Sequence, residues 1–150
     1  MAEKCWEDFK VGDKFRTQGV TVTETHVVNW TSLTGDWYPL HTDEEWAKKN
    51  TAFGGRIVHG PLTFALAVGL VGLSGIFEDS LIAWLGMDKM RLPRPVRIGD
   101  TIHVEPEVID KKETSKSERG VTTFKYIVKN QKDEVVGEWE YLLLMHRRQS

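Results

Sequence analysis

Asp36 and His41 are the two side chains whose types and spacing are best suited to chemistry. Pro39 has no backbone N–H and disfavours the α conformation at Tyr38, and Gly35 is a typical helix stop. We therefore expect an irregular loop in which the carboxylate and the imidazole converge. Such a pair facing one water can act as general acid and base, because histidine titrates near neutral pH. A solvated turn without catalytic role is the alternative that the spacing leaves open.

A glycine–proline pair opens a second stretch that could do chemistry. Pro61 suits the first turn of a helix, and the residues that follow are apolar on nearly all sides, so we expect a buried helix. The first N–H groups of a helix have no partner within it, so the Gly60 N–H could stabilise an oxyanion on a carbonyl. Alternatively, Gly60 merely permits the turn. The apolar stretch is shorter than the ~20 residues that a bilayer requires, so no membrane span is expected.

Short helices on both sides should position the Asp36 loop. Thr23 or Thr25 could cap a helix that ends near Thr34, with Trp30 on its core-facing side. After His41, Thr42 and Glu45 fit a capping box with Thr42 as the N-cap, and the helix should run to about Asn50 with Trp46 on its buried side.

The rest of the chain reads as antiparallel strands. We expect strands at residues 14–22, 81–92, 101–109, 121–129 and 135–146, a polar hairpin loop at 111–120 and a tight turn at 130–133. Gly86 suggests a bulge in the second strand, and Trp84, Met87 and Met90 suggest that this strand is buried. Two prolines exclude a central strand at residues 92–97. Strands gathered around one buried helix make an α+β architecture.

Composition narrows the function classes. The 150-residue chain is 40% hydrophobic and 28% charged with a net charge of −2, which favours one folded domain and argues against nucleic-acid binding. Cys5 is the single cysteine, and no apolar signal segment opens the sequence, so a cytoplasmic protein is expected. His26 is expected to be exposed on the first helix, and His103 and His146 lack an acidic or cysteine partner at ligand spacing, so we expect no metal centre.

Two motifs resemble the MaoC-like dehydratases, a group that includes the (R)-specific enoyl-CoA hydratases, or hydratase-2 enzymes. They are Gly35-Asp36-x-x-Pro39-Leu40-His41-x-Asp43 and, after Phe53, Ile57-Val58-His59-Gly60-x-Leu62. Pro95-Val96-x-Ile98-Gly99-Asp100 before a strand also fits, and the resemblance covers about residues 6–145.

The resemblance implies a single hotdog domain over residues 1–150, in which a curled antiparallel sheet wraps one long helix. It also implies a homodimer or higher homo-oligomer with active sites between subunits. Asp36 and His41 would activate a water that adds across a trans-2-enoyl thioester of coenzyme A or acyl-carrier protein, giving the (R)-3-hydroxyacyl product. The Gly60 N–H would polarise the thioester carbonyl, and no cofactor is needed.

Further residues are expected around the substrate. Tyr38 stands where the family usually has Asn, and Thr63 is the nearest hydroxyl to where the family often has a Ser that bonds the catalytic carboxylate. His59 should support the helix entry through hydrogen bonds. Arg94 and Arg97, with Arg91, could contact the phosphates of coenzyme A, because guanidinium groups bind phosphate in a bidentate manner, although a solvated basic loop is the alternative.

Two other functions remain open. Many hotdog thioesterases place an acid on the central helix, but residues 62–73 contain none. A non-catalytic acyl-thioester-binding or regulatory module has its support in Tyr38, whereas the presence of both Asp36 and His41 argues against it.

Overall fold

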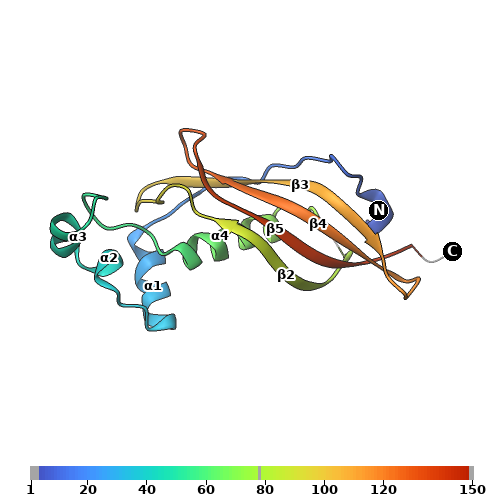
Figure 1. The fold of residues 1–150 in the computed structure, drawn as a ribbon, viewed down its shortest axis with the longest axis horizontal. Helices are drawn as coiled ribbons and strands as arrows, with labels where there is room; N and C mark the ends of the chain where they lie inside the picture. Colours follow the sequence, from blue (N-terminus) through green and yellow to red (C-terminus); the bar gives the residue numbers. More distant parts are fainter. Residues whose placement is uncertain (1–3, 78, 149–150) are drawn as a thin grey trace.

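A five-stranded antiparallel sheet curls around one long helix (Figure 1), with strand order β1-β3-β4-β5-β2. The computed structural model describes residues 4–77 and 79–148. The helices are η1 (Trp6–Asp8), α1 (Glu24–Thr34), α2 (Pro39–Thr42), α3 (Glu44–Asn50) and α4 (Gly60–Leu73), and the strands are β1 (Val20–Thr21), β2 (Leu81–Arg91), β3 (Thr101–Glu113), β4 (Arg119–Lys129) and β5 (Val135–His146). The expected α+β architecture is confirmed. Both ends of the chain lie at one end of the molecule, and α1, α2 and α3 form a lobe at the other.

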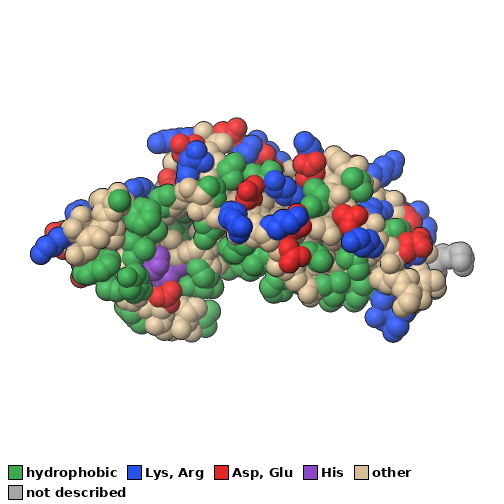
Figure 2. Space-filling model, viewed as in Figure 1, with side chains coloured by type: hydrophobic (Ala, Val, Ile, Leu, Met, Phe, Trp, Pro, Cys, Tyr) green, Lys and Arg blue, Asp and Glu red, His purple; other side chains and the backbone are tan. Residues whose placement is uncertain are grey.

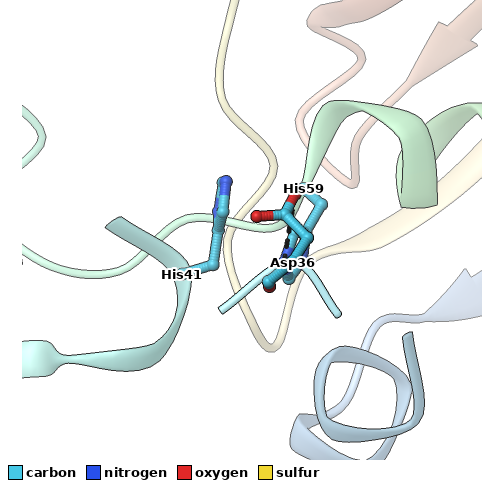
Figure 3. A group of neighbouring side chains, drawn as sticks. All are labelled: Asp36, His41 and His59. Carbon is cyan, nitrogen blue, oxygen red and sulfur yellow. Dashed lines mark hydrogen bonds and ion pairs between the residues drawn. The ribbon is translucent and has the colours of Figure 1, made fainter. Parts of the chain in front are cut away.

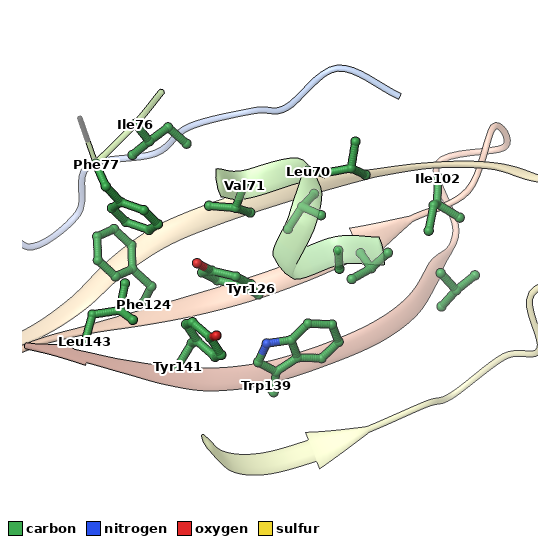
Figure 4. Close-up of a cluster of buried hydrophobic side chains, with 14 of the residues drawn as sticks. Leu70, Val71, Ile76, Phe77, Ile102, Phe124, Tyr126, Trp139, Tyr141 and Leu143 are labelled. Carbon is green, nitrogen blue, oxygen red and sulfur yellow. The ribbon is translucent and has the colours of Figure 1, made fainter. Parts of the chain in front are cut away.

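The core lies between α4 and the concave face of the sheet. Alternate residues of β4 and β5 are buried, as the two-residue period of a strand requires. Aromatic rings fill this space (Figure 4): Phe77 and Phe124 have ring centroids 5.4 Å apart, and Tyr126 and Tyr141 4.9 Å apart. Such pairs contribute about 0.5–1.5 kcal/mol each beyond the area they bury.

The sheet covers α4 on one side, so the expectation of a helix buried all round is wrong for the single chain. Leu62, Ala67 and Val71 are buried, whereas Leu73 is 72% exposed. A half-barrel of five strands can enclose a helix only partly. The uncovered side of α4 therefore presents apolar surface.

The edge strand β2 differs from its expected burial. Met87 and Met90 pack against the core as expected, but Trp84 is 51% exposed, although its ring stacks on Tyr141. Among the described residues, β2 pairs with β5 alone, which leaves its other edge open. The expected bulge is confirmed, because the pairing register shifts between Trp84 and Gly86.

The first expected strand is mostly an extended segment without a full ladder. Val20–Thr21 pairs with β3, and Lys14 forms an isolated bridge with Glu107. Between them, the N–H groups of Phe15 and Thr17 donate to the β3 carbonyls of Pro106 and Val104. Pro106 has no N–H to return, which explains why the ladder is one-sided there. The hairpin loop is also shorter than expected, since β3 extends to Glu113 and β4 begins at Arg119. Within residues 4–77 and 79–148, no helix has the length and apolar character to cross a membrane.

Candidate active site

Asp36 lies directly beyond the C-terminal end of α1. Gly35 ends this helix with φ of 75°, a left-handed conformation that glycine adopts without strain, which confirms the expected stop. The Asp36 side chain is 45% exposed. Its Oδ1 accepts a long hydrogen bond of 3.4 Å from the Tyr38 N–H. The carboxylate is thus open to solvent and able to bind a water.

His41 lies on a short helical turn, so the expectation of a wholly irregular loop is wrong. Pro39 begins α2, because its fixed φ suits a first helical position. The His41 Nδ1 lies 2.8 Å from the Ile57 carbonyl oxygen. A carbonyl only accepts hydrogen bonds, so Nδ1 carries the proton, and Nε2 of the neutral ring is left with a free lone pair. Nε2 can therefore accept a proton from water.

Thr42 holds the loop between Asp36 and His41 and is not the N-cap of α3. The Thr42 hydroxyl lies within hydrogen-bond distance of the carbonyls of Trp37 and Tyr38, at 3.0 and 3.2 Å. The N-cap of α3 is Asp43, whose Oδ1 accepts the Trp46 N–H at 2.8 Å, so the expected capping box is wrong by one residue. The helix does end at Asn50 as expected, but Trp46 is only half-buried.

His59 links both catalytic candidates from the start of α4. Its side chain is 0% exposed, and its Nε2–H donates to the Asp36 carbonyl at 3.1 Å. Its ring stacks on that of His41, with centroids 3.9 Å apart and planes 26° apart. Burial is the main cause that lowers the pKa of His59, and His41 lowers it further. Nδ1 has no partner among the described residues. The expected supporting hydrogen bond is present, and it reaches Asp36.

The three side chains converge (Figure 3), with one ligand-type atom from each of Asp36, His41 and His59 lying within 4.8 Å of the others. This spacing is short enough for a metal ion. However, the two stacked imidazoles keep their lone pairs in separate, nearly parallel planes, so a single ion at about 2.0–2.1 Å from both would lie poorly in either ring plane. The geometry fits a water held between the Asp36 carboxylate and the His41 ring better.

A second cluster corrects the expectation that His103 has no acidic partner. Its Nε2 lies 3.1 Å from a Glu105 carboxylate oxygen, and Asp133 lies close enough to complete a group of possible metal ligands. The i, i+2 spacing on a strand was the signal, since it places both side chains on one face. The Lys129 ammonium lies 2.8 Å from Glu105 and 3.5 Å from Asp133, so a cation already neutralises these carboxylates.

A cavity of about 300 Å³ opens beside His41. It is lined by His41, Phe53, Ile57, Val58, Gly60, Thr63, Leu92, Pro93, Arg94, Pro95, Val96 and Val136. A side chain at position 60 would place its Cβ 2.6 Å from Leu92 Cδ1, so glycine permits this close approach. Figure 2 shows the histidine and acidic side chains in the hollow between the helical lobe and the sheet.

Of the other residues expected around the substrate, Thr63 and Arg94 line the cavity, whereas Tyr38 and Arg97 do not. Thr63 lines the cavity, but its hydroxyl donates to the His59 carbonyl at 3.3 Å. Tyr38 is 55% exposed, packs its ring on Trp46 and does not line the cavity. Arg94 lies at the cavity and also borders a neighbouring hollow of about 200 Å³, where Arg97 lies.

Residues 8–130 match the family described as MaoC like domain. The chain belongs to this family. It is 36% identical to Protein MaoC of Klebsiella aerogenes over 116 residues, which are 77% of this chain and 33% of that protein. The chain therefore spans about a third of the length of this MaoC relative. It is 32% identical to a 3-hydroxybutyryl-CoA dehydratase of Methylorubrum extorquens over 89 residues, which are 59% of this chain and 54% of that enzyme.

Solved structures share the fold. A protein of Archaeoglobus fulgidus described as a monoamine oxidase regulatory protein superposes with a TM-score of 0.91 at 39% identity, covering 98% of this chain and 97% of that one. An (R)-hydratase of A. caviae superposes with a TM-score of 0.74 at 28% identity, covering 91% and 97%. A Mycobacterium tuberculosis protein with a double hotdog fold, 20% identical, superposes with a TM-score of 0.85 over 97% of this MaoC-like chain and 45% of that one. The expected hotdog fold is confirmed.

Proposed function

We propose that this MaoC-like protein is a hydro-lyase that adds water to a trans-2-enoyl-CoA to give an (R)-3-hydroxyacyl-CoA, or that removes water from such a 3-hydroxyacyl thioester. One observation carries the proposal. The Asp36 carboxylate and the His41 ring, whose Nδ1–H is committed to the Ile57 carbonyl, meet beside a cavity that contains the N-terminus of α4. This arrangement supplies an acid, a base and a donor to one bound thioester.

In the proposed reaction, the Asp36 and His41 pair first accepts a proton and then donates one. A water lies between the Asp36 carboxylate and His41 Nε2, and the pair removes one of its protons as the oxygen adds to C3 of the substrate. The electron pair of the C2–C3 double bond moves toward the thioester, and C2 then takes a proton from the pair. Negative charge builds on the thioester oxygen, where the Gly60 N–H donates. Loss of one such donor costs about 3 kcal/mol of transition-state stabilisation.

Relatives support this class of reaction. The matched dehydratase of Methylorubrum extorquens acts on a 3-hydroxybutyryl-CoA by its name, and the A. caviae structure is an (R)-hydratase. Arg94 at the cavity edge is the group that we propose to meet the phosphates of a coenzyme A carrier, and Arg97 in the adjoining hollow the second. Acyl-carrier protein, whose prosthetic group also bears a phosphate, is the other carrier class. The single cysteine, Cys5, suits the reducing cytoplasm that we propose as the location.

We also propose a homodimer. Leu73 on α4 and Trp84 and Leu85 on β2 are 72%, 51% and 53% exposed. Exposed apolar side chains beside an open sheet edge favour pairing with another chain. A second copy of the protein would pair along the open edge of β2 and cover these side chains.

A regulatory module that binds an acyl thioester without turnover is the second candidate. It is favoured by the Archaeoglobus fulgidus relative, which is described as a regulatory protein, and by the Asp36 carboxylate, for which the one hydrogen bond found in the described part of the chain is the 3.4 Å contact from Tyr38. A thioesterase has less support, since α4 carries no acid.

One substrate panel separates these three functions. Purified protein is mixed with trans-2-enoyl-CoA esters of increasing chain length, and the absorbance of the conjugated thioester is followed. Its loss without release of free thiol supports the hydro-lyase, and thiol release supports the thioesterase. Saturable binding with neither change supports the regulatory module.

A further inference from the structure

Arg56 joins three segments of the candidate site. It lies between the buried Gly55 and the half-buried Ile57 in the stretch that leads to α4. Its guanidinium donates to both carboxylate oxygens of Glu24 on α1, at 2.8 and 2.9 Å. Its Nε–H and its backbone N–H both donate to one oxygen of Glu44 on α3, at 3.2 and 3.1 Å. A single residue thus binds two helices to the stretch before α4.

Each of these segments carries one part of the candidate site. Asp36 follows the far end of α1, and His41 precedes α3 by a few residues. Ile57, the neighbour of Arg56, accepts the His41 Nδ1–H and donates its own N–H to the Leu40 carbonyl at 3.3 Å. The position of the Arg56 backbone therefore bears directly on the tautomer and the direction of the His41 ring.

Packing and charge both hold Arg56 in place. Its side chain is only 21% exposed. A Cβ at Gly55 would lie 2.9 Å from the Glu44 carboxylate, so glycine there allows Glu44 to close over the backbone. The hydrogen bonds from Arg56 lower the pKa of Glu24 and of Glu44, so both carboxylates stay ionised and the contacts persist at neutral pH.

We propose that Arg56 is a positioning residue, which sets the distance between Asp36 and His41 by fixing α1 and α3 to the stretch before α4. This role rests on the proposed function for its effect on turnover. It does not require Arg56 to touch the substrate, since Arg56 does not line the cavity. The guanidinium suits this role because its several N–H donors, fixed in one plane, can bind two carboxylates from different helices at once. A lysine ammonium does this less well.

Arg147 provides a matched control. Its side chain is also 21% exposed and also joins two carboxylates, with Nε 3.0 Å from Glu7 and an amino group 3.1 Å from Glu113. It lies at the opposite end of the molecule from α1, α2 and α3, near the C-terminus (Figure 1). Arg147→Gln should therefore reproduce the loss of stability but not the loss of positioning.

The test compares Arg56→Gln, Arg56→Lys and Arg147→Gln in the full chain. We expect Arg56→Gln to lower kcat by about 10–100-fold, as a displacement of about 1 Å between reacting groups does. Arg56→Lys should recover part of this loss, and Arg147→Gln should leave kcat unchanged. In parallel, long-range proton–nitrogen NMR, assigned with His41→Gln, reports the tautomer of the His41 ring. The wild type and Arg147→Gln should show the Nδ1–H tautomer, and Arg56→Gln should show a mixture of both tautomers.

The two readouts keep the positioning role distinct from the proposed function. If the wild type turns over no enoyl thioester, the proposed function fails, and the tautomer comparison alone decides the role of Arg56. The role is overturned if Arg56→Gln keeps the His41 tautomer and its kcat falls no further than that of Arg147→Gln.

Discussion

The imidazole of His41 stacks on that of His59, with ring centroids 3.9 Å apart and planes 26° apart. The outer ring faces the cavity, and the inner one is 0% exposed. His59 also donates to the carbonyl of Asp36. His59 therefore links His41 to the Asp36 backbone, and burial and the neighbouring His41 lower its own pKa.

His59 should make stability depend on pH. Burial lowers its pKa below the usual 6.5, so the unfolded chain takes up a proton at a pH where the folded chain does not. The free energy of unfolding should fall as pH decreases below 6.5, down to the folded pKa, by about 1.4 kcal/mol for each unit of pKa difference. Denaturant unfolding from about pH 7 to about pH 5.5 measures the slope.

His59→Gln should remove this part of the slope, whereas the exposed His146→Gln should leave it unchanged. Equal slopes in the wild type and His59→Gln would show that His59 is not the group responsible.

Gly60→Ala should lower activity, because the added Cβ would clash with Leu92. The added Cβ would lie 2.6 Å from Leu92 Cδ1, so the Leu92 side chain, which is 44% exposed, would have to move. Leu92 also lines the cavity, so its displaced side chain would narrow the space for the substrate, and kcat/KM should fall while the thermal midpoint changes little. Leu92→Ala removes the clash, and the double variant should recover most of the loss. A double variant no better than Gly60→Ala alone would contradict this explanation.

Arg94 should contribute to binding of the carrier rather than of the acyl chain. If it binds a phosphate of coenzyme A, Arg94→Gln should raise KM for an enoyl-CoA about tenfold, the equivalent of one hydrogen bond to a charged group. KM for the enoyl thioester of N-acetylcysteamine, which has no phosphate, should not change. Arg91→Gln is the control, since Arg91 is exposed and lies outside the cavity lining. An equal rise for both substrates would place the effect of Arg94 elsewhere.

The exposed apolar side chains along β2 should determine the oligomeric state. Leu85 is 53% exposed on β2, and Leu85→Glu would place a charge in the proposed contact between two copies. Sedimentation should show a dimer for the wild type and a monomer for this variant. Val11→Glu changes an equally apolar side chain that is 63% exposed elsewhere, and it should remain dimeric. A wild type that sediments as a monomer would refute the proposed dimer.

Local signals predicted many elements of the fold. The left-handed Gly35 marked the end of α1, and strand alternation with the turn at Asn130 gave β5 as Val135–His146. These features depend on neighbouring residues only. The open side of α4 was not predictable, because an apolar helix looks the same whether its own sheet or a second chain covers it.

The site was predictable in its residues but not in its contacts. Motif positions indicated Asp36, His41 and Gly60, whose catalytic roles stay predictions. The hydrogen bond from His41 to Ile57 joins residues 16 positions apart through a backbone carbonyl, which no side-chain type signals. The hydrogen bonds from Arg56 to Glu24 join residues 32 positions apart, and they depend on how two helices pack.

The comparison of wild type with Asp36→Asn on a short trans-2-enoyl-CoA tests the central proposal most directly. Asp110→Asn is the matched control, since its side chain is 47% exposed, close to the 45% of Asp36, and lies on β3. We predict rapid loss of the conjugated thioester absorbance for the wild type and Asp110→Asn, and none for Asp36→Asn, although it still binds the substrate. Turnover by Asp36→Asn at the wild-type rate would contradict the assignment of Asp36, and absence of turnover by the wild type with every chain length would contradict the hydro-lyase itself.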